Sequence, residues 1–180
     1  PATIILLQNA VLIANNWLIY SCLTFGIFMN FSFLASAIYH ASKNTKRRKI
    51  LQKFDHAAIY SFIAGSYTPF TLVVLREQGI WGWLLFCIIW AAALGGWVIS
   101  FRNFKNKGKI EMAVYIAMGW AVVVAFKPLI DVLSAEKAMI ILWWLIAGGI
   151  AYTVGAVIYA IKKIEFSHTL WHLFVLAGAI

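Results

Sequence analysis

Long apolar runs, separated by short polar tracts, occupy most of the 180 residues. The runs cover residues 2–14, 17–41, 54–75, 80–101, 110–126, 138–161 and 166–180. They lack the strict alternation of apolar and polar positions that marks a transmembrane β-strand, so each run favours an α-helix. The pattern therefore predicts an all-α bundle of seven transmembrane helices, with the weakest division at Asn15 and Asn16.

The composition agrees with a membrane environment. Hydrophobic residues make up 63% of the chain, charged residues 12%, and the mean hydropathy is +0.86, whereas a soluble domain has about 25% charged residues. A soluble globular protein is therefore excluded. Because lipid offers the backbone no hydrogen-bond partners, a membrane segment must satisfy its own backbone, as a helix does. We predict one integral membrane domain covering residues 1–180.

The net charge of +9 is distributed in a pattern typical of membrane topology. The connections after the second, fourth and sixth runs hold Lys43, Lys46, Arg47, Arg48, Lys49 and Lys53, then Arg102, Lys105, Lys107 and Lys109, then Lys162 and Lys163. The other connections hold only Arg76, Lys127 and Lys137, each with acidic neighbours. By the positive-inside rule, the three basic connections are cytoplasmic, which places the N-terminus in the cytoplasm and the C-terminus outside.

This distribution argues against a nucleic-acid partner, because the basic residues lie between apolar runs and form no basic helix face. We expect a multi-pass protein of the cell membrane. The chain begins at Pro1, and its last apolar stretch, residues 167–180, would rise about 21 Å as a helix, short of the roughly 30 Å hydrocarbon core. We therefore expect the terminal helices to be incomplete.

Small residues and one proline predict the packing of the bundle. Pro69 should kink or locally open the third helix, and the pairs Gly95-Gly96 and Gly148-Gly149 would allow close helix approach. Cys22 and Cys87 lie inside apolar runs without metal-ligand spacing, so a cysteine metal site or disulfide framework is not indicated.

Five polar residues are expected at the cytoplasmic face. Ser36 and His40 are four residues apart near the inner end of the second helix, and His168 and His172 repeat that spacing at the inner start of the seventh. Four residues turn a helix by about 400°, so each pair lies on one helix face. Asp55 is expected to open the third helix directly after the basic connection, at the same depth.

Three imidazoles with one open position are a common catalytic zinc arrangement. We predict His40, His168 and His172 as ligands of zinc. Zinc lowers the pKa of a bound water to about 7. The Asp55 carboxylate would orient that water, accept its proton, or hold a ligand histidine in the required tautomer. Ser36 would bond to these groups or to a substrate oxyanion.

A simpler interpretation stays open. The histidines would then lie at the lipid headgroup boundary, and Asp55 would cap the third helix near Lys53. The spacing of His168 and His172 also lacks the intervening glutamate of the zinc-protease motif. His56 competes as a ligand, but it points about 100° away from Asp55 on a helix. We interpret His56 as a local structural or interfacial residue.

These motifs resemble the hemolysin III family, within the wider progestin and adipoQ receptor group that includes adiponectin receptors. The resemblance spans nearly the whole chain and rests on SAIYH at 36–40, FDHAAIYSFIAGSYTPF at 54–70, MGW at 118–120, KPL at 127–129 and HTLWHLFVLAGA at 168–179. It implies seven transmembrane helices and a cytoplasm-facing zinc site bound by His40, His168 and His172, with Asp55 and Ser36 as polar partners. The polar N-terminal stretch usual in the family is absent from this sequence.

The resemblance also implies kinship with membrane hydrolases that include alkaline ceramidases, for which attack of zinc-activated water on a lipid amide is the proposed chemistry. We therefore predict a zinc-dependent hydrolase of a lipid amide or ester that enters from the bilayer. One alternative is a non-enzymatic sensor or regulator of membrane lipid with a structural zinc. Another is a cytolysin, which the family name suggests, although a pore needs a polar stripe along a complete span. The oligomeric state stays open.

Overall fold

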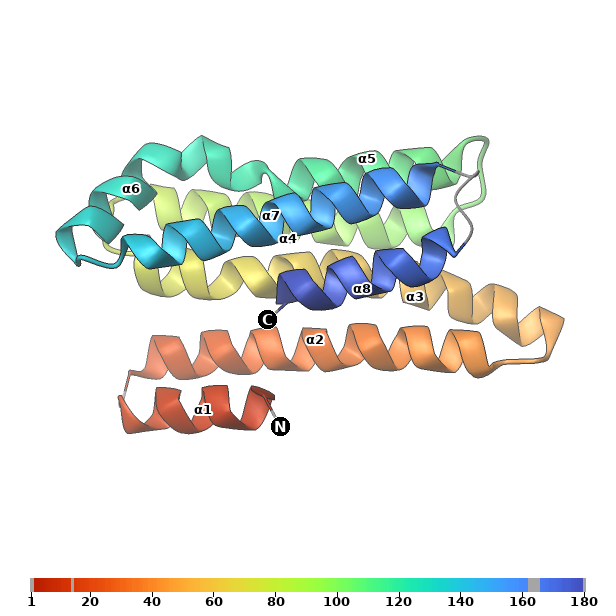
Figure 1. Cartoon of the computed structure of the whole chain (residues 1–180), viewed down its shortest axis with the longest axis horizontal. Coiled ribbons are helices and arrows are strands. Elements are labelled where there is room, and N and C mark those ends of the chain that lie inside the picture. The colour runs from red at the N-terminus through yellow and green to blue at the C-terminus, as the bar shows by residue number, and fades with distance from the viewer. Residues whose placement is uncertain (1, 14, 162–165, 180) are drawn as a thin grey trace. The chain divides into compact units, whose positions relative to one another are not determined.

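The computed structural model describes residues 2–13, 15–161 and 166–179; within them, the side chains of residues 2, 3, 5, 6, 160, 168 and 179 are not described. Every regular element in these ranges is helical, and no strand occurs among them (Figure 1). The elements are α1 (Ala2–Leu12), α2 (Asn16–Ala41), α3 (Thr45–Pro69), the π-helix η1 (Phe70–Val74), α4 (Trp81–Phe101), α5 (Lys107–Gly119), the 3₁₀-helix η2 (Ala121–Ala125), α6 (Phe126–Ala135), α7 (Met139–Ala160) and α8 (Ser167–Ala179).

Each of the seven predicted apolar runs coincides with a helical segment, so the all-α prediction is confirmed. Five of the described segments are long and apolar enough to cross a membrane: Asn16–Ala41, Thr45–Val74, Trp81–Phe101, Lys107–Ala135 and Met139–Tyr159. The first and last helices are shorter, with 11 residues in α1 and 13 in α8.

The start of α3 differs from the prediction. The apolar run begins at residue 54, but α3 begins at Thr45, where the Asn44 side chain accepts hydrogen bonds from the backbone N–H groups of Lys46 (3.0 Å) and Arg47 (3.1 Å). Lysine, arginine, leucine and glutamine are good helix formers, so the polar segment continues the helix outward from the apolar run. Asp55 therefore lies inside α3 and does not open it.

The fifth segment also extends beyond its predicted run, which ends at residue 126. The chain continues through η2 into α6, so most of the predicted connection is helical. Pro128 lies in the first turn of α6, where its missing N–H removes no intrahelical hydrogen bond. Leu129 and Leu133 are buried on one face of α6, whereas Lys127 and Asp131 are exposed. An apolar-run criterion misses such an amphipathic helix because half of its surface is polar.

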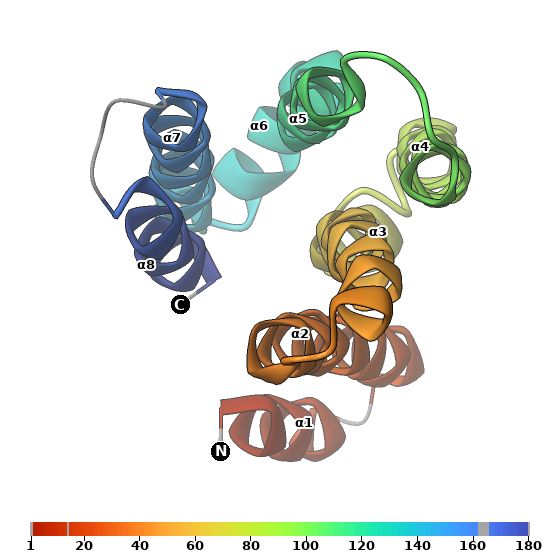
Figure 2. The same cartoon turned by 90° about the vertical axis from the view of Figure 1, so that its right-hand side faces the viewer.

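The described contacts divide the chain into two compact units, Pro1–Glu111 and Met112–Ile180. In the first unit, α3 lies between α2 and α4, and α1 lies beside α2 (Figure 2). α3 contributes more buried residues to this unit than any other helix, including Ala57, Ala58, Tyr60 and Ala64. In the second unit, α7 and α8 pack side by side.

Close packing joins α3 to α4. An added Cβ at Gly96 would overlap the ring of Tyr60, which is fully buried, whereas Gly95 has no atom within 4 Å of such a Cβ. The predicted close approach is therefore made by Gly96 and not by its neighbour. The Trp97 indole N–H donates to the Ser61 hydroxyl at 2.8 Å, which adds a polar contact between the same two helices.

The prediction for Pro69 is confirmed. The α-helical hydrogen-bond pattern of α3 ends at this residue, and the next turn, η1, is a π-helix whose last bond runs from the Leu75 N–H to the Phe70 carbonyl at 2.9 Å. Proline removes one backbone donor and crowds the preceding turn, which widens the helix locally.

We expect Gly96→Ala to lower the free energy of unfolding by about 1–3 kcal/mol relative to Gly95→Ala, because the new methyl group meets the immobile Tyr60 ring. Both variants gain the same helix propensity, so their difference isolates the packing effect. Thermal or denaturant unfolding in detergent measures it. Equal stability of the two variants would contradict the α3–α4 contact.

Candidate functional site

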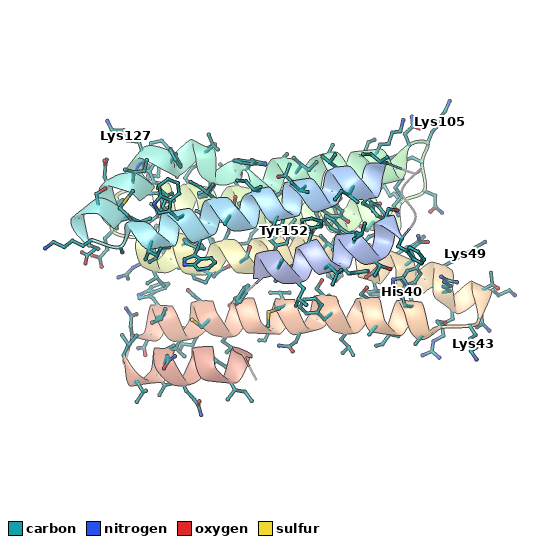
Figure 3. The ribbon with its side chains drawn as sticks, in the orientation of Figure 1. His40, Lys43, Lys49, Lys105, Lys127 and Tyr152 are labelled. Carbon is teal, nitrogen blue, oxygen red and sulfur yellow. The ribbon has the colours of Figure 1, made fainter. Side chains whose placement is uncertain are left out.

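Ser36 and His40 lie one turn apart near the end of α2. Ser36 is partly buried and His40 is exposed. The His40 ring meets the Tyr39 ring edge-on at 4.7 Å between centroids, and the Arg48 guanidinium from the first turns of α3 lies 5.3 Å above Tyr39. His40 lies at one end of the first unit, and Lys43 and Lys49 lie at the same end (Figure 3).

Asp55 is buried, with 8% of its surface exposed. It lies ten residues after the first residue of α3, and Asn44 caps that helix, so the interpretation of Asp55 as a helix cap is wrong. The flanking residues fasten this turn to the end of α4. The Lys53 ammonium donates to the Phe101 carbonyl at 3.2 Å, and the Phe54 ring meets the Phe101 ring edge-on at 5.0 Å.

His168 and His172 lie in the first two turns of α8, in the second unit. His172 is partly buried, and the side chain of His168 lies outside the described residues. The α8 helix is held on α7 by the Tyr159 and Trp171 rings, 6.1 Å apart, and by Phe174 against Gly155.

The structure therefore brings Ser36, His40 and Asp55 into one unit and carries the other two predicted residues in the other unit. Among the described side chains, which exclude His168, no group of three or more His, Cys, Asp or Glu residues forms a metal site. The three-histidine zinc site remains a prediction from the sequence.

A groove lies where the end of α2 meets the start of α3. Its lining is mostly apolar with one guanidinium, and consists of Ile38, Ala41, Ser42, Arg47 and Leu51. None of the five candidate residues lines it, but Ala41 directly follows His40.

Glu111, near the start of α5, is a buried acidic residue that the sequence analysis missed. It is only 2% exposed, and its Oε2 is 2.9 Å from His56 Nδ1. Its Oε1 accepts a hydrogen bond from the Ser100 hydroxyl at 3.0 Å and lies 3.8 Å from the Lys107 ammonium. The sequence did contain a signal for this residue, since Glu111 lies one residue inside an apolar run. An ionisable group in a membrane segment is costly without a partner, so its presence there indicates a buried interaction.

His56 was interpreted from the sequence as a local structural or interfacial residue, but its hydrogen-bond partner, Glu111, is not local. His56 belongs to α3, Ser100 to α4 and Glu111 to α5, so one polar network connects three helices. The Lys107 ammonium also donates to the Ser100 carbonyl near the end of α4, where the last carbonyls of a helix lack intrahelical partners.

The family model described as Haemolysin-III related matches residues 1–180. The chain is 38% identical to hemolysin-3 of Bacillus cereus, over 99% of this chain and 79% of that protein. It is 40% identical to the hemolysin-3 homolog of Bacillus subtilis (strain 168), over 99% of this chain and 81% of that protein. The human monocyte to macrophage differentiation factor is 32% identical over 82% of this chain and 60% of its own length. No solved structure matches.

Proposed function

The chain belongs to the haemolysin-III-related family, and on this basis we propose that it is a seven-transmembrane, zinc-dependent hydrolase of a membrane lipid amide or ester. The resemblance inferred from the sequence motifs is confirmed, and the similarity to monocyte to macrophage differentiation factor supports the wider progestin and adipoQ receptor grouping. One structural observation carries the proposal. Asp55 is a buried carboxylate inside α3, and α3 packs against α2, the helix that carries Ser36 and His40.

We infer that the end of the first unit that carries His40 faces the cytoplasm. Lys43, Lys49 and Lys105, from two different connections, lie at the same end of the first unit (Figure 3). Basic residues collect on the cytoplasmic side of a membrane protein, so their common position supports the topology read from the charge pattern. The seven helical segments, taken as seven crossings, give a cytoplasmic N-terminus and an external C-terminus.

His40, His168 and His172 would hold the zinc ion, because neutral imidazole nitrogen suits this metal and three protein ligands leave one position for water. When bound, zinc supplies a Lewis acid and lowers the pKa of water. The three histidines suit a zinc ion, because neutral imidazole binds the metal without burying a negative charge.

Asp55 would transfer the protons of the reaction, and Ser36 would stabilise the developing negative charge. Asp55 accepts a proton from the attacking water as the water oxygen bonds to the lipid carbonyl carbon. It then returns that proton to the leaving amine or alcohol as the C–N or C–O bond breaks. The Ser36 hydroxyl donates a hydrogen bond to the carbonyl oxygen that gains negative charge.

A lipid substrate is supported by the groove at the α2–α3 corner. Its aliphatic lining from Ile38, Ala41 and Leu51 suits an acyl chain, and Arg47 suits a polar headgroup. Because the groove includes the residue after His40, a lipid lying there would be close to the end of α2.

A cytolytic pore is the weaker alternative, although the name of the Bacillus cereus relative describes a hemolysin. Buried polar residues do occur along α3, beyond the one end that the sequence analysis considered. However, Thr68 and Thr71 donate to carbonyls of their own helix, and Ser61 accepts from Trp97. These hydroxyls are used inside the first unit and do not form a water-lined stripe.

The topology is tested with single cysteines in a Cys22→Ser/Cys87→Ser background. We expect Lys49→Cys to react with a membrane-impermeant maleimide only from the cytoplasmic side. Glu77→Cys should react only from outside, because the two residues lie at opposite ends of the α3 span. Labelling of both cysteines from one side would contradict the proposed orientation.

Purified protein is expected to contain about one zinc per chain, measured by elemental analysis. Zinc should be lost in His40→Ala and in His172→Ala, whereas His56→Gln should retain it, because His56 pairs with Glu111 and is not a proposed ligand. A metal-free parent protein, or equal zinc in all four proteins, would contradict the site.

The enzymatic role is separated from a structural or sensing role by Asp55→Asn. We expect this variant to lower hydrolysis of a fluorescent short-chain ceramide by about 10²- to 10⁴-fold, the usual contribution of a general base. Its zinc content and melting temperature should stay near those of the parent. Zinc-loaded parent protein that turns over no lipid amide or ester would favour the sensor.

A further inference from the structure

We infer that Glu111 is a positioning residue: through His56 it holds the membrane-entry turn of α3, and with it Asp55, in one orientation. The inference rests on the proposed function for the role of Asp55. It gives the His56–Glu111 pair a task that is separate from zinc binding and from proton transfer.

The burial of Glu111 indicates that its network with His56, Ser100 and Lys107 fixes the local arrangement of the three helices. Moving a carboxylate out of water costs several kcal/mol, and a buried ion pair only offsets this when its partners are well placed. Here Oε2 is used by His56, and Oε1 is used by Ser100 and Lys107. In proteins, a well-packed apolar cluster is often as stable as such a network, so we attribute the network to the single arrangement that it specifies.

The chemistry of the pair fixes the histidine ring. An ionised carboxylate only accepts hydrogen bonds, so Nδ1 of His56 must donate to Glu111. The position of the His56 ring is thus set from α5. Ser100, which is fully buried on α4, holds the same carboxylate from the other side.

Because Asp55 and His56 are neighbours on one helix, fixing His56 also fixes the direction of Asp55. Adjacent residues on a helix point about 100° apart, and backbone hydrogen bonds keep that angle nearly constant. With His56 held by Glu111, the direction of the Asp55 side chain is set within the same turn. Lys53 and Phe54 hold this turn against the end of α4, and the His56–Glu111 bond holds it against α5.

The decisive experiment measures the exposure of position 55 directly. Asp55→Cys is introduced into the full chain lacking Cys22 and Cys87, and its rate of reaction with a small maleimide is followed in detergent. We expect Glu111→Gln to raise this rate at least about fivefold, since the turn loses its fixed orientation. Glu77→Gln is the matched control, because Glu77 is exposed and its carboxylate pairs with the neighbouring Arg76.

Kinetics on the chain with Asp55 intact give the second measurement. With the fluorescent ceramide as substrate, Glu111→Gln should lower kcat about 10- to 100-fold, as expected for misplacement of a reacting group, with KM within about twofold of the parent. Zinc content should not change. The His56→Gln/Glu111→Gln double variant should lose no more than the worse single variant, because the two residues act as one unit.

The outcomes separate this inference from the proposed function. A lower melting temperature with unchanged labelling and unchanged kcat would show a purely structural role and overturn the inference. If the parent hydrolyses no lipid, the proposed function fails, and the labelling rates alone decide the role of Glu111. If Glu111→Gln does not fold, Glu111→Asp keeps the charge but shortens its reach, and an unchanged labelling rate in that variant overturns the inference.

Discussion

The absence of hydrogen-bond partners in lipid is the constraint on which this molecule depends. Each polar group carried into the membrane must find its partner within the protein, and α3 shows how this is achieved. Its hydroxyls donate back to its own carbonyls or accept from α4 tryptophans. Its histidine pairs with a carboxylate of α5. The helix with the most polar character therefore lies between α2 and α4, and the lipid-facing positions are left to apolar side chains.

The same constraint accounts for where the buried carboxylates lie in the fold. Asp55 and Glu111 are both buried carboxylates, and each follows a basic stretch of the chain within a few residues. Glu111 bonds to side chains of α3 and α4 and lies near Lys107 of its own helix, whereas Asp55 lies on α3, which packs against the helix of Ser36 and His40. Two acidic groups of the same kind are thus given different tasks by their neighbours, one in holding the structure and one in the proposed proton transfer.

The sequence predicted the helices well because long apolar runs leave the backbone few other choices. It failed where a helix is polar: the first turns of α3 follow the Asn44 cap, and α6 buries Leu129 and Leu133 on one face while its other face is polar. Ser36, His40 and Asp55 could be grouped from charge topology, which needs no tertiary contact. The partnership of His56 with Glu111 could not, since it joins residues 55 positions apart and follows from helix packing.

The unbroken course of α3 from Thr45 has an electrical consequence. Lys49 is exposed and Asp55 is buried, yet only about 9 Å of one helix separates them. Within that distance the medium changes from water, where mobile ions screen a charge over about 8 Å at physiological ionic strength, to an interior where they do not. Salt therefore weakens the field of the outer lysines while the interactions around Asp55 and Glu111 keep their strength.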